Sequence, residues 1–229
     1  MIVFARYSSR NLLSVTVDRW KLLSRACANA STSHAKSKQP AKLMLLDVDC
    51  GVDDAFAIIL ALSKYHTSKV LAITCVNGNT GIDQTVKNVA YVLQGCNRDD
   101  IPVYAGAAFP LCGESVRIPV YHGFDGLGDM NNRIDNPQWM DQILQKEHAV
   151  NAMIHLVNQH QKEISLIAVG PLTNLALAQR LDPMFPSKLK DLTIMGGNYQ
   201  GRLAIYNHSV KEFVLYIDTY DETIFERMH

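Results

Sequence analysis

The sequence predicts an α/β domain built on an open, mostly parallel, Rossmann-like sheet flanked by helices. Three observations lead to this prediction. Short apolar runs alternate along the chain with segments of helical periodicity. Polar loops that contain glycine follow the carboxyl ends of several of these runs. The chain has 229 residues, of which 48% are hydrophobic and 19% are charged, and this suits one domain with a sizeable core.

Continuous apolar runs predict the strands, because a strand that is covered on both faces lacks the alternation of a half-exposed one. We expect strands at residues 43–48, 70–76, 101–104, 164–169 and 189–195, with residues 214–217 as a further candidate. The run at 70–76 leads into a polar, glycine-containing loop, and the run at 189–195 ends in two glycines. These loops would gather at one edge of a parallel sheet.

Helical periodicity predicts four helices, at residues 55–62, 83–95, 148–159 and 175–181. The first is apolar on all sides, which indicates burial. The last follows a Gly-Pro turn, with Thr173 or Asn174 as its candidate cap. Glycines are frequent between residues 105 and 138, and the segment 122–128 among them predicts a mobile loop at the active site.

Charge and cysteine content exclude several classes of protein. The formal net charge is zero, so neither nucleic-acid binding nor a membrane-surface role has electrostatic support. No apolar run reaches the length of a transmembrane helix. The odd number and wide spacing of the cysteines predict reduced thiols in an intracellular protein and do not favour a zinc site. They are Cys27, Cys50, Cys75, Cys96 and Cys112.

Residues 1–41 predict an N-terminal extension that precedes a domain at 42–229. The first 42 residues contain eight Lys or Arg and one acidic residue, and they are rich in serine. This composition is typical of a mitochondrial presequence, and a disordered extension explains it equally well. The expected location is therefore intracellular, either cytosolic or, if residues 1–35 are a presequence, mitochondrial.

Four carboxylates lie between two apolar runs, at Asp47, Asp49, Asp53 and Asp54. Like charges at this spacing raise one another's pKa or require a cation. Asp47 and Asp49 would share one face at the end of a strand. Gly51 would permit a tight turn, after which Asp53 and Asp54 would open a helix. Ligands that are all oxygen favour Ca²⁺ or Mg²⁺ over zinc. The alternative is that the acids only cap the helix and make structural hydrogen bonds.

The motif D-V-D-C-G-V-D-D at 47–54 resembles the signature D-x-D-P-G-x-D-D of the inosine–uridine preferring nucleoside hydrolase family. Further blocks resemble the same family in the same order. They are V-N-G-N at 76–79, H-G-F-D-G-L-G at 122–128, A-V-G-P-L-T-N at 168–174 and I-M-G-G at 194–197. The resemblance covers about residues 42–218 and implies the nucleoside hydrolase fold.

The resemblance implies a function. The family cleaves the N-glycosidic bond of purine and pyrimidine ribonucleosides with water, giving free base and ribose, and uses a bound Ca²⁺. It implies that Asp49, Asp54 and the backbone carbonyl of Val169 bind the ion. Asp49 would also take a proton from the attacking water. A homodimer or homotetramer is the implied assembly, with a nucleoside as the substrate.

The resemblance also implies residues that contact the substrate. Asp53, Asn79, Met195 and Glu212 would line the ribose, His122 would lie near the leaving base, and Asp47 would support the metal loop from behind. Four of them have a plainer reading. Asn79 is also a turn former, His122 an ordinary loop histidine, Met195 a core residue and Glu212 a surface charge.

The sequence departs from the family pattern in three places. Cys50 stands where the signature has proline, and a small apolar residue suits a turn. Val214 stands where the family's E-F-N block supplies an asparagine to the ribose, and the block at 218–221 is altered as well. The chain reads as a C-terminally truncated member, because it ends at His229 before a family segment that carries a His-Asp pair. Weak or absent hydrolysis is the corresponding expectation.

Two other functions remain open from the sequence. One is a non-catalytic, nucleoside hydrolase-like binding protein. The other is a haloacid-dehalogenase-type phosphatase, in which Asp47 would be the nucleophile and Asp49 the acid, with Mg²⁺. The phosphatase reading leaves Asp53 and Asp54 unexplained and gives no role to the later motifs.

Overall fold

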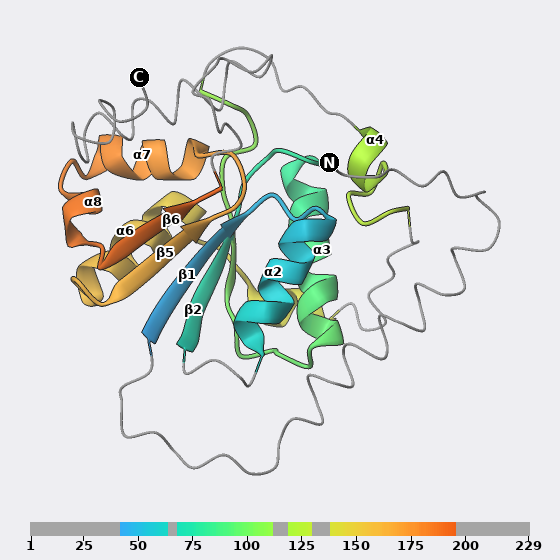
Figure 1. Cartoon of the computed structure of the whole chain (residues 1–229), viewed down its shortest axis with the longest axis horizontal. Coiled ribbons are helices and arrows are strands. Elements are labelled where there is room, and N and C mark those ends of the chain that lie inside the picture. Colours follow the sequence, from blue (N-terminus) through green and yellow to red (C-terminus); the bar gives the residue numbers. More distant parts are fainter. Residues whose placement is uncertain (1–41, 64–67, 112–118, 130–137, 196–229) are drawn as a thin grey trace, which may run out of the picture.

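A computed structural model describes residues 42–63, 68–111, 119–129 and 138–195. The described chain forms one six-stranded sheet in the order β4-β3-β2-β1-β5-β6, and every neighbouring pair is parallel (Figure 1). The strands are β1 (Lys42–Val48), β2 (Ser68–Cys75), β3 (Val103–Ala105), β4 (Leu144–Gln145), β5 (Ile164–Ala168) and β6 (Asp191–Ile194). The predicted open, parallel α/β sheet is confirmed.

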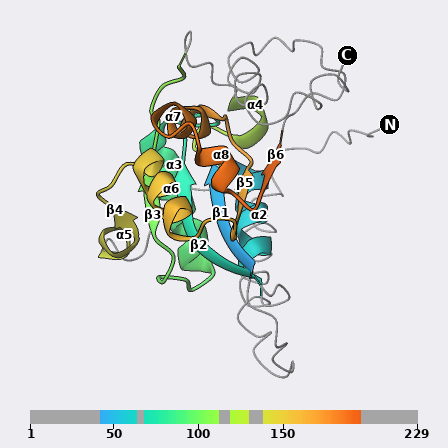
Figure 2. The same cartoon turned by 90° about the vertical axis from the view of Figure 1, so that its left-hand side faces the viewer.

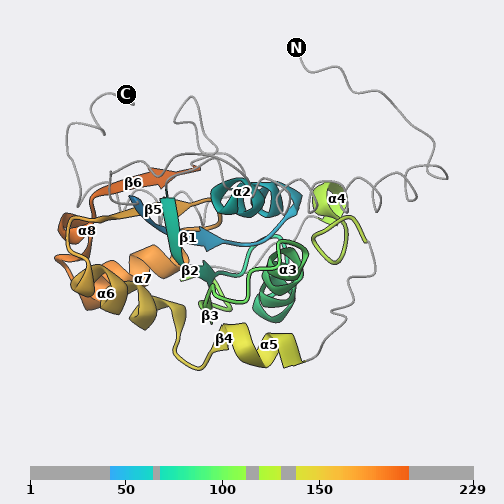
Figure 3. The same cartoon turned by 90° about the horizontal axis from the view of Figure 1, so that it is seen from below.

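Helices cover both faces of this sheet. They are α2 (Val52–Leu62), α3 (Ile82–Gly95), α4 (Pro119–His122), α5 (Gln138–Ile143), α6 (Ala149–Gln159), α7 (Thr173–Leu181) and α8 (Phe185–Lys188). Figure 2 shows α6, α7 and α8 in front of the sheet. Seen from below, α2 lies on one side of the sheet and α6 and α7 lie on the other (Figure 3).

The central strand β1 contributes to two hydrophobic clusters because its side chains alternate between the faces. Leu46 and Val48 pack in the cluster that contains α2 and α3. Leu45 packs in the cluster that contains α6, α7 and α8. Burial on both sides explains why the sequence of β1 is a continuous apolar run.

The topology places the end of β1 at the switch point of the sheet. Successive strands run from β1 through β2 and β3 to β4 on one side, and the chain then returns to add β5 and β6 on the other. The direction therefore reverses between β1 and β5. In open α/β sheets, ligands bind outside the carboxyl ends of the strands at this switch point. Asp47 lies there, paired in register with Thr74 of β2 and Ala168 of β5.

Several element boundaries differ from the sequence expectation. Helix α2 begins at Val52, before the apolar run expected from residue 55, and Asp53 and Asp54 lie in its first turn as predicted. Helix α7 begins at Thr173, and no side chain caps it, so the predicted cap by Thr173 or Asn174 is wrong. The short elements β4, α4, α5 and α8 were not predicted. The extension at 1–41 and the strand candidate at 214–217 lie outside the described residues.

Two further expectations concern membranes and cysteines. Within the described ranges, no helix is both long enough and apolar enough to cross a membrane. The cysteines that lie there are Cys50, Cys75 and Cys96, and of these Cys50 and Cys75 are buried, free thiols. Cys27 and Cys112 lie outside the described part of the chain.

Candidate active site

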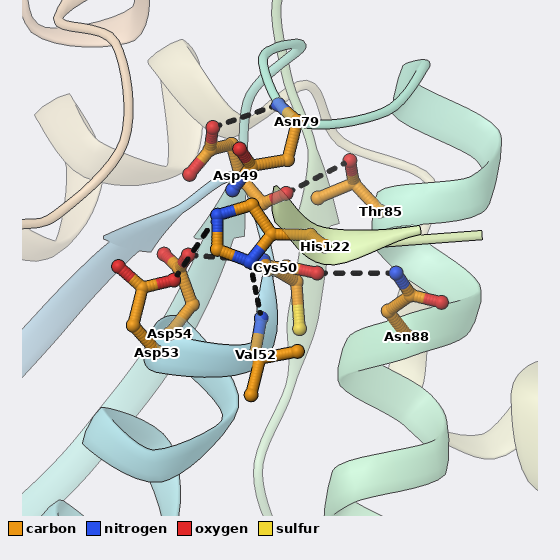
Figure 4. Close-up of polar contacts among 10 residues, drawn as sticks. Asp49, Cys50, Val52, Asp53, Asp54, Asn79, Thr85, Asn88 and His122 are labelled. Atoms are coloured by element: carbon orange, nitrogen blue, oxygen red, sulfur yellow. Dashed lines mark hydrogen bonds and ion pairs between the residues drawn. The ribbon is translucent and has the colours of Figure 1, made fainter. Parts of the chain in front are cut away.

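The segment 49–54, here called the aspartate turn, joins β1 to α2 (Figure 4). The backbone N–H of Gly51 donates to Asp54 Oδ2 at 2.9 Å, and the Gly51 carbonyl accepts from Ala55 at 3.0 Å. Asp54 thus reaches back over the start of α2, where a carboxylate is favoured by the partial positive charge of the helix end. One oxygen of Asp54 is committed to the turn, and the other is available.

Asp49 and Asp54 form a buried carboxylate pair. Their exposed fractions are 7% and 1%. Asp49 Oδ2 accepts from the backbone N–H of Asn79 at 2.8 Å, whereas Asp54 Oδ1 has no hydrogen-bond partner among the described residues. Burial raises the pKa of both groups, and burial together with the nearby charge of Asp49 raises the pKa of Asp54 to about 8. Without a cation, the pair therefore retains a proton near neutral pH.

Asp47 lies beneath this pair and is fully buried. Its Oδ1 accepts from Thr74 Oγ1 at 2.7 Å and from Asn174 Nδ2 at 2.9 Å. Burial raises the pKa of Asp47 to about 7, although both hydrogen bonds oppose the shift. This carboxyl is enclosed by protein groups, so it suits a supporting position behind the aspartate turn and not a nucleophile that a substrate must reach.

Asn174 joins the carboxyl ends of three strands. Besides Asp47, its Nδ2 donates to the Cys75 carbonyl at 2.9 Å, and its Oδ1 accepts from the Ala107 N–H at 2.9 Å. Sequence reasoning assigned this residue to a helix cap and missed this role. Its position inside the A-V-G-P-L-T-N block was the available signal.

Three predicted substrate residues meet around Gly51. A Cβ atom built on Gly51 would lie 3.1 Å from both Asp53 Oδ1 and His122 Nδ1, and it would collide with Asn79 Nδ2. His122 Nδ1 also accepts from the Val52 N–H at 3.3 Å, and its Nε2 lies 3.8 Å from Asp53 Oδ1. The Asp53 side chain is 56% exposed and that of His122 is 24% exposed. These polar groups form an accessible rim beside the buried carboxylate pair (Figure 4).

The remaining predicted residues lie on the β5–β6 side or outside the structure. The Val169 N–H donates to the Asp47 carbonyl at 2.9 Å, and a Cβ on Gly170 would lie 2.8 Å from Asp49 N, so the turn at 169–170 packs against Asp49. Met195 directly follows β6 and is 53% exposed, which does not suit the core reading. Glu212 lies outside the described residues.

The loop at 122–129 is closed by its own hydrogen bonds. Asp125 Oδ1 accepts from the N–H groups of Leu127 at 2.7 Å and Asp129 at 2.8 Å. Asp129 Oδ1 accepts from the Phe124 N–H at 2.6 Å. Leu127 is 3% exposed and belongs to the core. The glycines that predict mobility therefore serve a compact turn, in which two aspartates satisfy the backbone.

Helix α3 supports the aspartate turn from behind. Thr85 Oγ1 donates to the Asp49 carbonyl at 3.5 Å, and Asn88 Nδ2 donates to the Cys50 carbonyl at 3.1 Å (Figure 4). Both side chains are fully buried. Sequence reasoning missed both residues, although a Thr and an Asn three positions apart beside the apolar stripe were a usable signal.

Cys50 adopts a backbone conformation that proline cannot adopt. Its φ is 35°, in the left-handed region, whereas the proline ring holds φ near −65°. The side chain is fully buried, and burial raises the pKa of the thiol well above its usual value. The departure from the signature therefore accompanies a different backbone path through the turn.

The fold and the site define a class, namely a doubly wound α/β protein with a buried acidic site at its switch point. A sequence model of the inosine-uridine preferring nucleoside hydrolase family matches residues 44–220, and the chain belongs to this family. The recognition made from the motifs is thereby confirmed.

Curated relatives agree with this assignment. The chain is 35% identical over 178 residues to the inosine-uridine preferring nucleoside hydrolase of Crithidia fasciculata, a match that covers 77% of this chain and 54% of the relative. It is 33% identical over 157 residues to probable uridine nucleosidase 1 of Oryza sativa subsp. japonica, covering 68% and 47%. The chain thus spans about half the length of these relatives.

Solved structures show the same fold. An inosine-guanosine nucleoside hydrolase superposes with a TM-score of 0.69 at 31% identity, covering 78% of this chain and 56% of the other. A plant nucleoside hydrolase gives a TM-score of 0.61 at 35% identity, covering 69% and 49%.

Proposed function

We propose that this protein hydrolyses the N-glycosidic bond of purine or pyrimidine ribonucleosides, releasing free base and ribose. The observation that supports this most strongly is the position of the buried Asp49–Asp54 pair at the switch point, beside a rim of Asp53, Asn79 and His122. The names of the relatives support the same substrate class, because they include uridine nucleosidases and inosine–uridine preferring hydrolases.

The donor atoms suit a hard cation, and we propose Ca²⁺ as the cofactor. Asp49 and Asp54 offer carboxylate oxygens, and the unpartnered, buried Asp54 Oδ1 is costly unless a cation or proton meets it. Within the described residues, no group of three or more His, Cys, Asp or Glu side chains forms a metal cluster. The resemblance to the family implies that the backbone carbonyl of Val169 is the third protein ligand. When bound, the ion would neutralise the pair and lower the pKa of water beside it.

The side chains around the turn would have different roles in the reaction. The resemblance to the family implies that Asp49 accepts the proton of the attacking water, and the backbone N–H of Asn79 holds one of its oxygens in place. Asp53 and Asn79 would bind ribose hydroxyls and stabilise the oxocarbenium-like transition state. His122 would lie near the leaving base. Loss of a hydroxyl partner leaves a carboxylate unpaired, so 2′-deoxynucleosides should be poor substrates.

Met195 and Glu212 would complete the ribose contacts, with Asp47 behind the metal loop. The assembly would be a homodimer or homotetramer, and the location would be intracellular, either cytosolic or mitochondrial. Phosphatase chemistry is not proposed, since the Asp47 nucleophile that it needs is fully buried, with its Oδ1 held by Thr74 and Asn174.

The test measures release of reducing sugar from inosine and from uridine by the purified protein in Ca²⁺. We expect release that is lost in chelator and falls by at least about a hundredfold in Asp49→Asn, the size of a general-base effect. Asp191→Asn is the matched control, because Asp191 is an exposed carboxylate at the start of β6. Equal rates in the wild type and Asp49→Asn would refute the assigned base. Nucleoside binding by calorimetry without any release would establish a binding protein instead.

A further inference from the structure

We infer that Asn88 is a positioning residue that fastens the loop at 122–129 to the aspartate turn and thereby fixes the place of His122. Asn88 lies on α3 and is fully buried. It belongs to neither the predicted motifs nor the rim around Gly51. Its importance follows from the two segments that its amide group joins.

Every polar group of the Asn88 side chain has a partner. Nδ2 donates to the Cys50 carbonyl at 3.1 Å and to the Asp125 carbonyl at 2.8 Å. Oδ1 accepts from Gln84 Nε2 at 2.9 Å, which orients the amide so that both donors face the site. One side chain thus binds the aspartate turn and the 122–129 loop at the same time, and Figure 4 shows its bond to the turn.

The loop is cross-linked by its own hydrogen bonds, so a contact made at one of its residues also constrains the others. The Asp125 and Asp129 carboxylates close the loop internally, and the Gly128 N–H donates to the His122 carbonyl at 2.7 Å. A second hydrogen bond between the 122–129 loop and the aspartate turn is longer. It runs from the Val52 N–H to His122 Nδ1, at 3.3 Å. A shift of the loop at Asp125 would therefore also move His122.

The close approach of the loop to Asn88 depends on Gly126. This glycine has a φ of 82°, and a Cβ at its position would lie 2.9 Å from Asn88 Nδ2 and 2.9 Å from Thr80 Cγ2. Any larger residue would strain the backbone and push the loop away from α3. Gly126 therefore offers a second, independent way to loosen the same contact.

The consequence for catalysis rests on the proposed function, in which His122 lies near the leaving base. The positioning itself is measurable without substrate or metal. A failure of the nucleoside assay would therefore leave this inference standing, and a failure of the inference would leave the assay unaffected.

The experiment is amide hydrogen exchange by NMR on Asn88→Asp, with the His122 ring signals recorded in the same samples. The variant keeps the acceptor for Gln84 and loses both donors. We expect exchange at Leu127 and Asp129 to accelerate roughly three- to tenfold, the effect of one lost hydrogen bond. The His122 ring signals should shift or broaden, while exchange at Leu166 in β5 stays unchanged. Asn158→Asp is the matched control, because Asn158 is exposed on α6.

The second variant is Gly126→Ala, which displaces the loop while Asn88 keeps both of its donors. It should accelerate exchange at Leu127 and Asp129 and alter the His122 signals, while exchange at Leu166 stays unchanged. The inference is overturned if neither variant changes the His122 ring signals. It is also overturned if Asn88→Asp accelerates exchange at Leu166 as much as at Leu127, because that pattern means general destabilisation.

Discussion

Asp47, Asp49 and Asp54 illustrate how burial makes a set of carboxylates dependent on protons or metal. All three have a raised pKa, and burial is the largest cause for each. Asp53 belongs to the same sequence cluster, yet its side chain is 56% exposed. The cluster therefore has two parts. Asp47, Asp49 and Asp54 are buried and need a proton or a cation, whereas Asp53 is exposed and can contact a ligand.

Replacing Asp54 by Asn should stabilise the metal-free protein and abolish its response to calcium. The amide keeps an acceptor for the Gly51 N–H and removes a buried carboxyl whose pKa is raised to about 8. We expect the free energy of unfolding in chelator at pH 8 to rise by roughly 1–3 kcal/mol. Urea unfolding with and without Ca²⁺ measures both effects.

Asp53→Asn is the control for this prediction. Its carboxylate is exposed, so the metal-free stability should change by less than about 0.5 kcal/mol. If Asp54→Asn keeps the full calcium-induced stabilisation, Asp54 is not a metal ligand.

The unit of β1, the aspartate turn and α2 depends on other elements for its shape. Helix α7 supplies Asn174 beneath the turn, and helix α3 supplies Thr85 and Asn88 behind it. Thr85 and Asn88 donate to backbone carbonyls of the turn, and Asn174 donates to the side chain of Asp47. The geometry of the turn is therefore held by hydrogen bonds from elements distant in sequence.

Removal of the Asn174 amide should destabilise the carboxyl ends of three strands at once. In Asn174→Ala, the Cys75 carbonyl and the Ala107 N–H each lose a hydrogen-bond partner in a buried region, and Asp47 Oδ1 loses one of its two donors. We expect a loss of about 2–4 kcal/mol in the free energy of unfolding, measured by urea denaturation. Asn158→Ala, at an exposed position, should cost much less, and equal losses would contradict the network described here.

Restoring the signature proline at Cys50 should destabilise this protein. The observed φ of 35° is unavailable to proline, so Cys50→Pro must distort the turn. The expected loss exceeds about 1 kcal/mol, measured as a lower Tm, together with weaker stabilisation by calcium. Cys50→Gly tests the cause, because glycine accepts a positive φ and should retain the calcium response. A Cys50→Pro protein with a higher Tm would show that the turn adopts the proline conformation.

At the scale of the whole molecule, the parallel sheet brings the site residues together at one edge and shields the carboxylates there from solvent. The two hydrophobic clusters on opposite faces surround β1, so the carboxylates at its end lie in a poorly solvated region. Polar loops after β1, β2 and β5 converge on that edge. The fold therefore creates both the location of the site and the raised pKa values within it.

These shifts predict the pH dependence of stability in chelator. The folded-state pKa values of Asp47 and Asp54, about 7 and about 8, lie above the ordinary value of 3.8. Between the ordinary pKa and the raised one, each of these carboxyls is ionised in the unfolded chain but still protonated in the folded protein. The free energy of unfolding should therefore fall as the pH rises from about 4 to about 8. Asp100 and Asp182, whose pKa values are lowered by Arg98 and Lys188, act only below about pH 4.

Urea unfolding at several pH values measures this dependence. Calcium should stabilise the protein more as the pH rises, because the ion displaces protons from the pair. The fall should be shallower in Asp54→Asn. A stability in chelator that rises between pH 5 and pH 8 would contradict the burial of these groups.

Local patterns in the sequence were sufficient to predict the α/β class, the central strands and helices and the acidic turn. Burial on both faces leaves a continuous apolar run in β1, and the four aspartates are neighbours in the chain, so both features are visible locally. Their motifs also led to the family. The boundary of α7 was predicted less well, because Asn174 suits a helix cap by its chemistry but is used in a buried network instead.

The contacts that shape the site could not be predicted in this way. Asn174 meets Asp47 across 127 residues of sequence, and Asn88 meets Cys50 across 38. A polar residue in a buried helix is expected to have a hydrogen-bond partner. The sequence does not identify this partner, because it depends on how the whole sheet packs. The aspartate turn and its concentration of carboxylates were therefore evident from the chain, whereas its supports on α3 and α7 and its unusual backbone at Cys50 emerged from the folded arrangement.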